Sequence, residues 1–365
     1  MIFRKLLTPC VALAALAGTG CGSDGGGTVE RFESAPIEPR PIAIVAETCA
    51  LDPLQLSALE QPALRKVARE LILVCPTVRL SGDVAPLDPD ARAAFARTVA
   101  RARTLGFKTR VAVTMGDDLA SFPVPYSPQR AAPVFADPAW RAKVVAGLAP
   151  FADMGDGLDI DFLNLPDPSR TDVSAFFVAL DLAFRPRVPL GVMAPPSTRD
   201  PSDTPGGNAF DLAVIAQHVD RVRLMTLDFS CCGQGGGPSI DSGWAVDVAR
   251  YGKSKSGNVP VDIAFPLYGT DFSELGESYV NYTDGRAIAD FFGIAPQRDI
   301  GGELFFDWND GAGRAHQTWY PDAVTTSRVL SAWNRDVIPP DVGVVLYGLG
   351  SEDPALWRTV AGGLP

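Results

Sequence analysis

Short apolar, strand-like runs alternate with amphipathic segments along most of this chain. Segments with helical periodicity lie between the runs, and the clearest are 64–71, 90–106, 138–154, 173–184 and 323–333. Alternating strands and helices indicate a parallel sheet, because each helix carries the chain back to the edge where the last strand began. The eight predicted strands are 41–47, 70–75, 108–115, 157–163, 189–194, 221–227, 259–265 and 342–347.

The length of the chain favours closure of these strands into a barrel. The chain has 365 residues, 46% of them hydrophobic, which is enough for one large core. Eight strand–helix units in that length match a (β/α)8 barrel better than an open doubly wound sheet. No Gly-rich phosphate-binding fingerprint follows the first predicted strand, which argues against a dinucleotide-binding sheet. The long interval before the last strand predicts an insertion at about 270–320 between the seventh and eighth strands.

The N-terminus has the character of a targeting segment. Basic residues precede an apolar run that is too short to span a bilayer comfortably, and small residues and Cys21 follow. The sequence LAGTGC resembles a bacterial lipobox, which implies a signal peptide over 1–20 and lipidation of Cys21. An ordinary signal peptide with a free secreted product is the alternative.

The lipobox reading implies an anchored protein of the bacterial cell envelope. Residues 21–40 are rich in Gly and Pro and are expected to form a flexible tether to a barrel over 41–365. Gly22, where an Asp would mark retention in the inner membrane, favours the outer membrane.

Charge and composition argue against several kinds of partner. The formal net charge of −11 argues against nucleic acid, whose phosphates are bound by clustered Lys and Arg. The chain has two histidines, and no Cys or His pair has metal-ligand spacing. We therefore expect a monomer with no cofactor and no transition metal, although an oxygen-only calcium site stays open.

The fourth predicted strand, in DGLDIDFL, carries acidic residues on its inward face. Asp159, Asp161 and Leu163 point to one side of the strand, and Ile160 and Phe162 point to the other. In a barrel the apolar pair faces the helices and the acids face inward. Neighbouring buried carboxylates are expected to titrate as a coupled pair with at least one raised pKa. Asp161 and Leu163 lie at the carboxyl end of the strand, where barrel enzymes build their active sites.

These residues resemble a signature of glycoside hydrolase family 18, the chitinase-like barrels. The signature is D-G-x-D-x-D-x-E, and the chain matches it at Asp156, Gly157, Asp159 and Asp161. Later segments resemble the family's M-T-Y-D-F, P-F-Y-G and G-G-V-M-x-W motifs in the same order, and they are MTLDF at 225–229, FPLYGTDF at 265–272 and GVVLYGL at 343–349. The resemblance spans about 41–357 and implies a (β/α)8 barrel with an insertion after its seventh strand.

The same resemblance implies that hydrolysis has been lost. In active members the signature glutamate protonates the glycosidic oxygen while the N-acetyl group of the substrate attacks the anomeric carbon. Leu163 stands at that glutamate position, and Leu227 stands at the tyrosine that hydrogen-bonds the N-acetyl group. General acid catalysis is worth about 10²–10⁴ in rate, and leucine cannot donate a proton. The residues of the degenerate site are Asp156, Asp159, Asp161, Leu163, Leu227 and Asp228.

The resemblance implies binding of an N-acetylhexosamine-containing glycan in the barrel cleft, where aromatic rings can stack on sugar faces. A hydrolase that uses another acid, such as Asp228 or Glu47, is the main alternative, and a protein-binding scaffold with a closed cleft is the second. Asp159 and Asp161 could also simply brace the barrel. The expected ligand contacts are Asp161, Asp228, Tyr268, Tyr347 and Trp308.

Four cysteines follow the tether, in a compartment that permits disulfides. Cys49 and Cys75 end the first and second predicted strands, which are neighbours in the barrel, and this arrangement predicts a disulfide between them. Cys231 and Cys232 could form a vicinal disulfide that stiffens a loop at the cleft mouth. The alternative is that they are separate thiols or that one pairs elsewhere.

Overall fold

The computed structural model describes residues 42–85, 87–116, 133–163, 165–231, 235–335 and 342–362. The predicted signal peptide over 1–20, Cys21 and the tether over 21–40 lie outside these residues. Within the described ranges, no helix is both long enough and apolar enough to cross a membrane.

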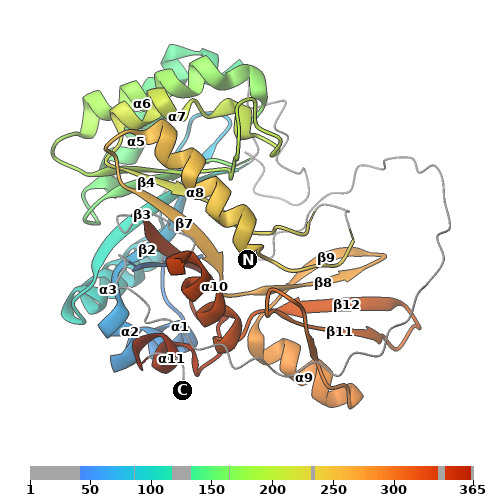
Figure 1. Ribbon diagram of the computed structural model, residues 1–365. Coiled ribbons are helices and arrows are strands. Elements are labelled where there is room, and N and C mark those ends of the chain that lie inside the picture. Colours follow the sequence, from blue (N-terminus) through green and yellow to red (C-terminus); the bar gives the residue numbers. More distant parts are fainter. Residues whose placement is uncertain are drawn as a thin grey trace.

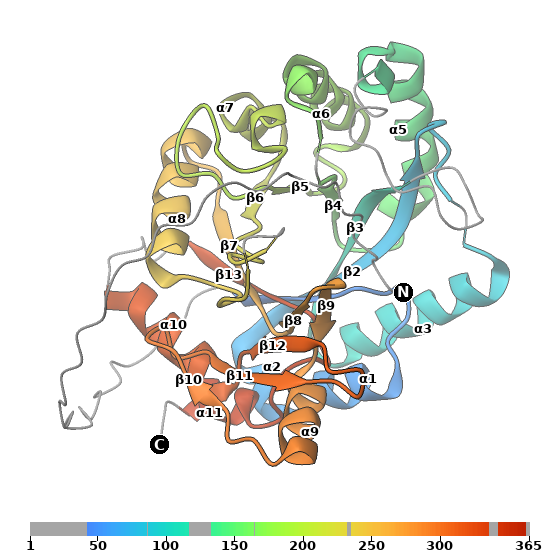
Figure 2. The same cartoon turned by 90° about the vertical axis from the view of Figure 1, so that its right-hand side faces the viewer.

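Eight parallel strands close into a barrel, as the sequence predicts, in the order β1-β13-β7-β6-β5-β4-β3-β2. Figure 2 looks along this ring from the side on which an inserted sheet lies. The barrel strands are β1 (Ile42–Ala46), β2 (Ala68–Arg79), β3 (Lys108–Gly116), β4 (Leu158–Asp161), β5 (Leu190–Ala194), β6 (Arg221–Leu224), β7 (Val261–Pro266) and β13 (Gly343–Tyr347).

Helices surround the ring, and local sequence sets where several of them begin (Figure 1). Asp52, Asp88 and Asp137 each accept a hydrogen bond from a backbone N–H of the first turn, and a proline follows each cap. The predicted helix over 64–71 ends early, at Val67, because β2 begins at the next residue. The helices are α1 (Pro53–Leu59), α2 (Pro62–Val67), α3 (Pro89–Thr104), α5 (Pro138–Ala152), α6 (Arg170–Phe184), α7 (Leu212–Ile215), α8 (Ser242–Ser256), α10 (Ala323–Arg335) and α11 (Leu356–Gly362).

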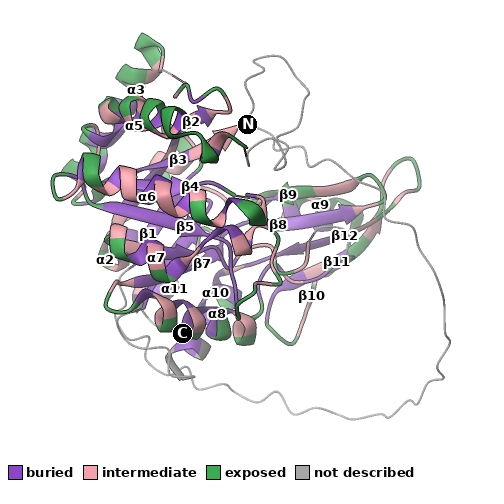
Figure 3. Cartoon of the chain, turned by 90° about the horizontal axis from the view of Figure 1, so that it is seen from above, coloured by how far each residue is buried: buried purple, intermediate pink, exposed green. Residues whose placement is uncertain are grey.

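The main hydrophobic core lies between the ring and its helices. Figure 3 shows the barrel strands buried and the outer helix faces exposed. Trp140, Trp333 and Trp357 are buried in this layer. A second, smaller cluster lies inside the barrel and includes Val45, Met193 and eight further buried residues on its strands and loops. The interior is therefore a packed layer of side chains, as in other (β/α)8 barrels.

The insertion between β7 and β13 forms an antiparallel sheet with strand order β10-β11-β12-β8-β9. In sequence the sheet runs from the start of β8 at Gly269 to the end of β12 at Tyr320, close to the predicted 270–320. Helix α9 covers one face of this sheet, over a core that includes Ala289, Phe306 and Tyr320. The elements are β8 (Gly269–Ser273), β9 (Gly276–Val280), α9 (Tyr282–Phe292), β10 (Gln297–Arg298), β11 (Leu304–Asn309) and β12 (Ala315–Tyr320).

Candidate functional site

Charged side chains inside the amino-terminal half of the barrel are paired with one another. Arg110 on β3 donates two hydrogen bonds to Asp159 on β4, each with an N–O distance of 2.8 Å. Arg223 on β6 contacts Glu70 and Asp262, and its Nε lies 3.5 Å from Asp159. Burial opposes ionisation of Asp159, but the two guanidinium groups outweigh it and hold the pKa of this carboxyl below its ordinary value. Asp159 therefore braces the barrel.

Two glycines make room for this ion pair. A Cβ atom on Gly191 of β5 would lie 1.8 Å from Oδ1 of Asp159. A Cβ atom on Gly157, just before β4, would lie 2.2 Å from Nη1 of Arg110. The bidentate pair fits because the neighbouring positions carry no side chain.

Asp161 lies two residues further along the same face of β4, at the carboxyl end. Its side chain is buried, 3% exposed, and Oδ1 has no hydrogen-bond partner within the described chain. Burial, followed by the negative charges of Glu47 and Asp159, raises the pKa of Asp161 to about 7. The two carboxylates thus interact as expected, and the raised pKa is found at Asp161, while the arginines lower that of Asp159.

Glu47 directly follows β1 and lies near enough to Asp161 for its charge to act on that carboxyl. Tyr347, the last residue of β13, donates a hydrogen bond to Glu47. The glutamate side chain is exposed to solvent, yet nearby protein atoms partly desolvate its carboxyl. Desolvation and the charge of Asp228 raise the pKa of Glu47, although the bond from Tyr347 acts in the opposite direction.

Asp228, in the loop after β6, links the barrel to the insertion. Its φ of 55° is in the left-handed region, which costs a non-glycine residue about 1–3 kcal/mol and persists only where surrounding contacts hold it. The hydroxyl of Tyr268, after β7, donates to Oδ1 over 3.1 Å. The hydroxyl of Tyr279, from β9 of the insertion, donates to Oδ2 over 3.4 Å. The rings of the two tyrosines meet edge to face with centroids 4.7 Å apart.

These residues form one group at the carboxyl end of the barrel, which we call the mouth cluster. Its members are Glu47, Asp161, Asp228, Tyr268, Tyr279 and Tyr347. The sequence indicated Asp161, Asp228, Tyr268 and Tyr347 as ligand contacts, and it indicated Glu47 only as an alternative acid. It missed Tyr279, because nothing in residues 276–280 shows that the inserted strand returns to the barrel.

Apolar side chains adjoin the mouth cluster where the family resemblance would place hydrolytic groups. Leu163, just after β4, is 42% exposed, and Phe229 is 40% exposed. Leu227 is half-buried and packs against the cluster inside the barrel. Neither leucine can donate a proton or a hydrogen bond.

Trp308 does not belong to the mouth cluster. It packs with the insertion core on the face that α9 covers. Its ring stacks on His316 with centroids 4.1 Å apart, and its Nε1 donates to Thr318 Oγ1 over 2.9 Å. Phe292 also lies against the ring, at 5.0 Å. Trp308 also lines a cavity of about 460 Å³ together with Tyr279, so its expected contact with a ligand stays a prediction.

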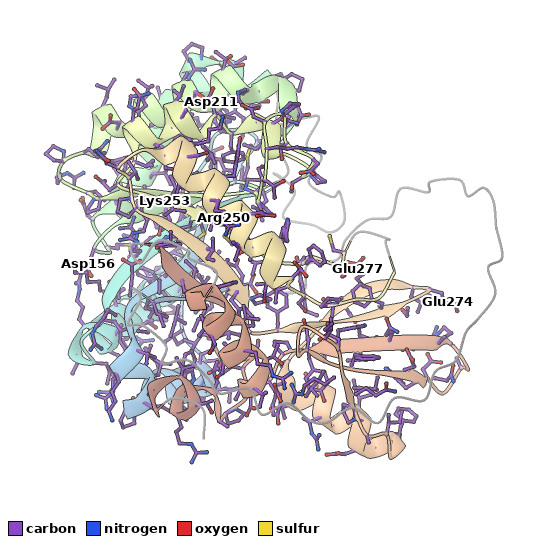
Figure 4. All side chains as sticks on the ribbon, in the orientation of Figure 1. Asp156, Asp211, Arg250, Lys253, Glu274 and Glu277 are labelled. Carbon is purple, nitrogen blue, oxygen red and sulfur yellow. A yellow bond between two sulfur atoms is a disulfide. The ribbon has the colours of Figure 1, made fainter. Side chains whose placement is uncertain are left out.

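Asp156 lies at the amino end of β4, away from the mouth cluster. Figure 4 labels it on the side of the barrel opposite to the insertion, which carries Glu274 and Glu277. Its carboxylate accepts hydrogen bonds from the backbone N–H of Thr109 over 2.8 Å and from Arg103 over 3.0 Å. Its place in the predicted degenerate site is thus corrected to a structural link between β3 and β4.

Cys49, shortly after β1, and Cys75 in β2 form a disulfide, the pairing that the adjacent strands predict. Cys231 is disulfide-bonded, and Cys232 lies outside the described residues. In the part of the chain that the structure describes, no group of three or more His, Cys, Asp or Glu side chains is arranged to hold a metal ion.

Comparisons with known proteins identify the fold. No family model matches the sequence, and no curated protein was found to be similar to it. Among solved structures, a chitinase from Chromobacterium violaceum ATCC 12472 matches with TM-score 0.73 and 21% identity, over 89% of this chain and 100% of that chain. The spore cortex-lytic enzyme SleL of Bacillus cereus matches with TM-score 0.70 and 17% identity, over 89% of this chain and 75% of that chain.

A third solved structure holds a saccharide. A class V chitinase from Nicotiana tobaccum in complex with NAG4 matches with TM-score 0.65 and 12% identity, over 88% of this chain and 98% of that chain. At these identities the likeness establishes the fold alone: this chain folds as a (β/α)8 barrel similar to the barrels of these chitinases and of SleL.

Proposed function

We propose that the mouth cluster binds a glycan that contains N-acetylhexosamine and that the protein does not hydrolyse it by the family 18 route. The cluster combines carboxylates, which can accept hydrogen bonds from sugar hydroxyls, with the ring of Tyr279, which is 51% exposed and can pack against a sugar face. Its position at the carboxyl ends of the strands is the usual place for a ligand in this architecture. The fold it shares with chitinases, one of them in complex with NAG4, supports the same class of ligand.

The proposed loss of hydrolysis rests on Leu163. The side chain stands where the resemblance places the proton donor, and at 42% exposure it is free to meet a ligand there. A ligand in that position would touch methyl groups rather than a carboxylic acid. Loss of a general acid lowers the rate by about 10²–10⁴, and replacement of the tyrosine by Leu227 removes a second contact.

An active hydrolase is the second candidate, and the raised pKa of Asp161 favours it. A carboxyl group with a pKa of about 7 is suited to general acid catalysis near neutral pH. Glu47, whose pKa is also raised, would be the alternative donor. In this reading Asp161 or Glu47 replaces the acid that Leu163 no longer supplies.

A glycan array combined with a hydrolysis assay distinguishes a glycan-binding protein from an active hydrolase. Purified protein is applied to immobilised hexosamine glycans, both fully N-acetylated and partly de-N-acetylated, and release of reducing ends is followed on soluble oligomers of both kinds. Binding without release above background supports the proposal. Robust turnover that disappears in Asp161→Ala or Glu47→Ala establishes the hydrolase instead, and the absence of both binding and turnover refutes the assignment to glycans.

We further propose that the barrel is exported and anchored in the bacterial envelope through a lipid on Cys21. The support is the lipobox resemblance and the Gly- and Pro-rich stretch over 21–40. Replacing Cys21→Ser should release the protein from the membrane fraction without changing the barrel. A wild-type protein that is already soluble and carries no lipid by mass spectrometry contradicts this proposal.

A further inference from the structure

The hydrogen-bond donors of the mouth cluster are already used within the protein. Tyr347 donates to Glu47, and Tyr268 and Tyr279 donate to Asp228. Each phenol has a single O–H, so its oxygen can then only accept a further hydrogen bond. Among the described residues of the cluster, the groups left for a ligand are therefore mainly acceptors.

An N-acetyl group makes a poor match to this arrangement. Its carbonyl oxygen is an acceptor and needs a donor on the protein. The residue that would stand there by the family resemblance is a tyrosine, but Leu227 carries no polar atom. A buried acceptor without a partner loses its hydrogen bond to water and gains none from the protein, which weakens the binding of an acetylated unit at this point.

Asp161 is the strongest unsatisfied acceptor of the cluster. Its Oδ1 is buried and has no hydrogen-bond partner within the described chain. The described charges that act on it are Glu47, across the barrel end, and Asp159, on its own strand, and both are negative. A ligand group that donates hydrogen bonds and carries positive charge would satisfy the oxygen and offset both repulsions.

We infer that the hexosamine unit placed over Asp161 carries a free, protonated amino group, so that the preferred ligand is a partly de-N-acetylated hexosamine polymer. An ammonium group supplies three donors and a positive charge, whereas an N-acetyl group supplies one donor and one acceptor. This inference rests on the proposed glycan-binding function and specifies its ligand.

Proton release distinguishes the two ligand types. Asp161 has a pKa of about 7, so nearly all molecules carry a proton on it at about pH 5.5, where a sugar amine is also protonated. An ammonium group binds the ionised carboxylate and should therefore expel about one proton per site at that pH, whereas a neutral acetylated unit should expel none. Isothermal titration calorimetry in two buffers of different ionisation enthalpy measures this number directly.

The experiment compares glucosamine and N-acetylglucosamine hexamers, together with a half-acetylated hexamer, as ligands of the full-length protein. We expect the half-acetylated and glucosamine hexamers to bind about 10- to 100-fold more tightly than the fully acetylated one, the range of a charged hydrogen bond. A lysine hexamer serves as a charge control, because the chain has a net charge of −11. It should bind weakly and without proton release.

Two variants test whether Asp161 is the group responsible. Asp161→Asn keeps the shape of the side chain, removes its charge and should lower affinity for the glucosamine hexamer about 10- to 100-fold while abolishing proton release. Glu274→Gln removes one negative charge at the exposed turn between β8 and β9. This variant should leave the affinity for the glucosamine hexamer and the proton release unchanged. Circular dichroism and thermal unfolding confirm that the variants are folded.

Each outcome decides a separate point. Equal or tighter binding of the acetylated hexamer overturns the inference and leaves the glycan-binding function standing. Tight binding of the lysine hexamer, or an equal loss of affinity in Asp161→Asn and Glu274→Gln, also overturns it, because the attraction would then be unspecific. Failure of every saccharide to bind refutes the proposed function itself.

Discussion

Asp159 and Asp161 lie two residues apart on one face of β4, yet the pKa of the first is lowered and that of the second is raised to about 7. Both side chains are buried. Asp159 meets Arg110 and Arg223, whereas the described charges acting on Asp161 are acidic. The comparison teaches that burial alone does not mark a functional carboxylate, since the partner supplied by other strands decides whether the group is satisfied or left for a ligand.

The largest expected loss of stability comes from disrupting the ion pairs in the amino-terminal half of the barrel. Arg223→Met removes a guanidinium that contacts Glu70, Asp159 and Asp262, and it should destabilise the fold by about 3–5 kcal/mol because buried charges are left uncompensated. Urea unfolding followed by circular dichroism measures the change. Arg286→Met, which removes an exposed arginine paired with Asp290 on α9, should shift stability by less than about 1 kcal/mol. Similar losses of stability in Arg223→Met and Arg286→Met would contradict the distinction between buried and exposed ion pairs.

Replacing Asp161, at the carboxyl end of β4, should change the free energy of unfolding in the opposite direction. In the folded protein Asp161 keeps its proton up to about pH 7, whereas in the unfolded chain it loses the proton near pH 4. Wild-type stability should therefore fall relative to Asp161→Asn as the pH rises from about 4 to about 7, by up to about 4 kcal/mol, and the difference should stay constant above that range.

Asp156→Asn is the matched control for this pH dependence. The hydrogen bonds from Thr109 and Arg103 outweigh partial burial and hold the pKa of Asp156 below its ordinary value. Stabilisation by that carboxylate is present above its unfolded pKa and is lost as the pH falls. The two variants should thus show pH slopes of opposite sign relative to wild type, and slopes of the same sign would contradict the assigned environments.

The disulfide that joins the loop after β1 to β2 allows a third comparison, between a covalent link and the ion pairs inside the barrel. Cys49 and Cys75 are separated by 26 residues in sequence. Replacing both by alanine should destabilise the protein by about 3 kcal/mol, because the unfolded chain regains the freedom of that loop. Urea unfolding of wild type and of the double variant in the same non-reducing buffer measures this loss, because the disulfide of Cys231 stays intact in both.

The smallest effect is expected from rebuilding the lost acid. Leu163→Glu combined with Leu227→Tyr restores the residue types of the family 18 signature next to Asp161. We expect only a trace of chitin-oligomer hydrolysis above the wild-type background, because nothing around these positions holds the new side chains in productive geometry. Wild-type turnover equal to or above that of the double variant would show that Leu163 does not limit the chemistry.

The fold was predictable because its signal is local. Each barrel strand is an apolar run of its own, and the alternation along β4 placed Asp159 and Asp161 inward before any partner was known. The charged partners were also visible as single acids or arginines within predicted strands, namely Glu70, Arg110 and Asp262. Their pairing was not, because strand alternation gives a direction for a side chain but not the residue that it meets.

The candidate site was predictable only where it lies on barrel strands or directly after them. Asp161, Asp228, Tyr268 and Tyr347 could be placed by motif order, while Tyr279 depends on how the inserted sheet docks on the barrel. The surroundings of Trp308 were unpredictable for the same reason, since the register of β11 places it in the insertion core beside α9.

The sequence by itself determined the strand–helix order, the inward direction of the acids and the absence of a proton donor at Leu163, since these depend on residue type and local periodicity. Only the tertiary structure decided that Asp159 is neutralised by arginines from β3 and β6 while Asp161 stays unpaired beside Glu47. The physical reason is that the energy of a buried charge depends on groups brought within a few ångströms of it by closure of the barrel, and those groups are far away in sequence.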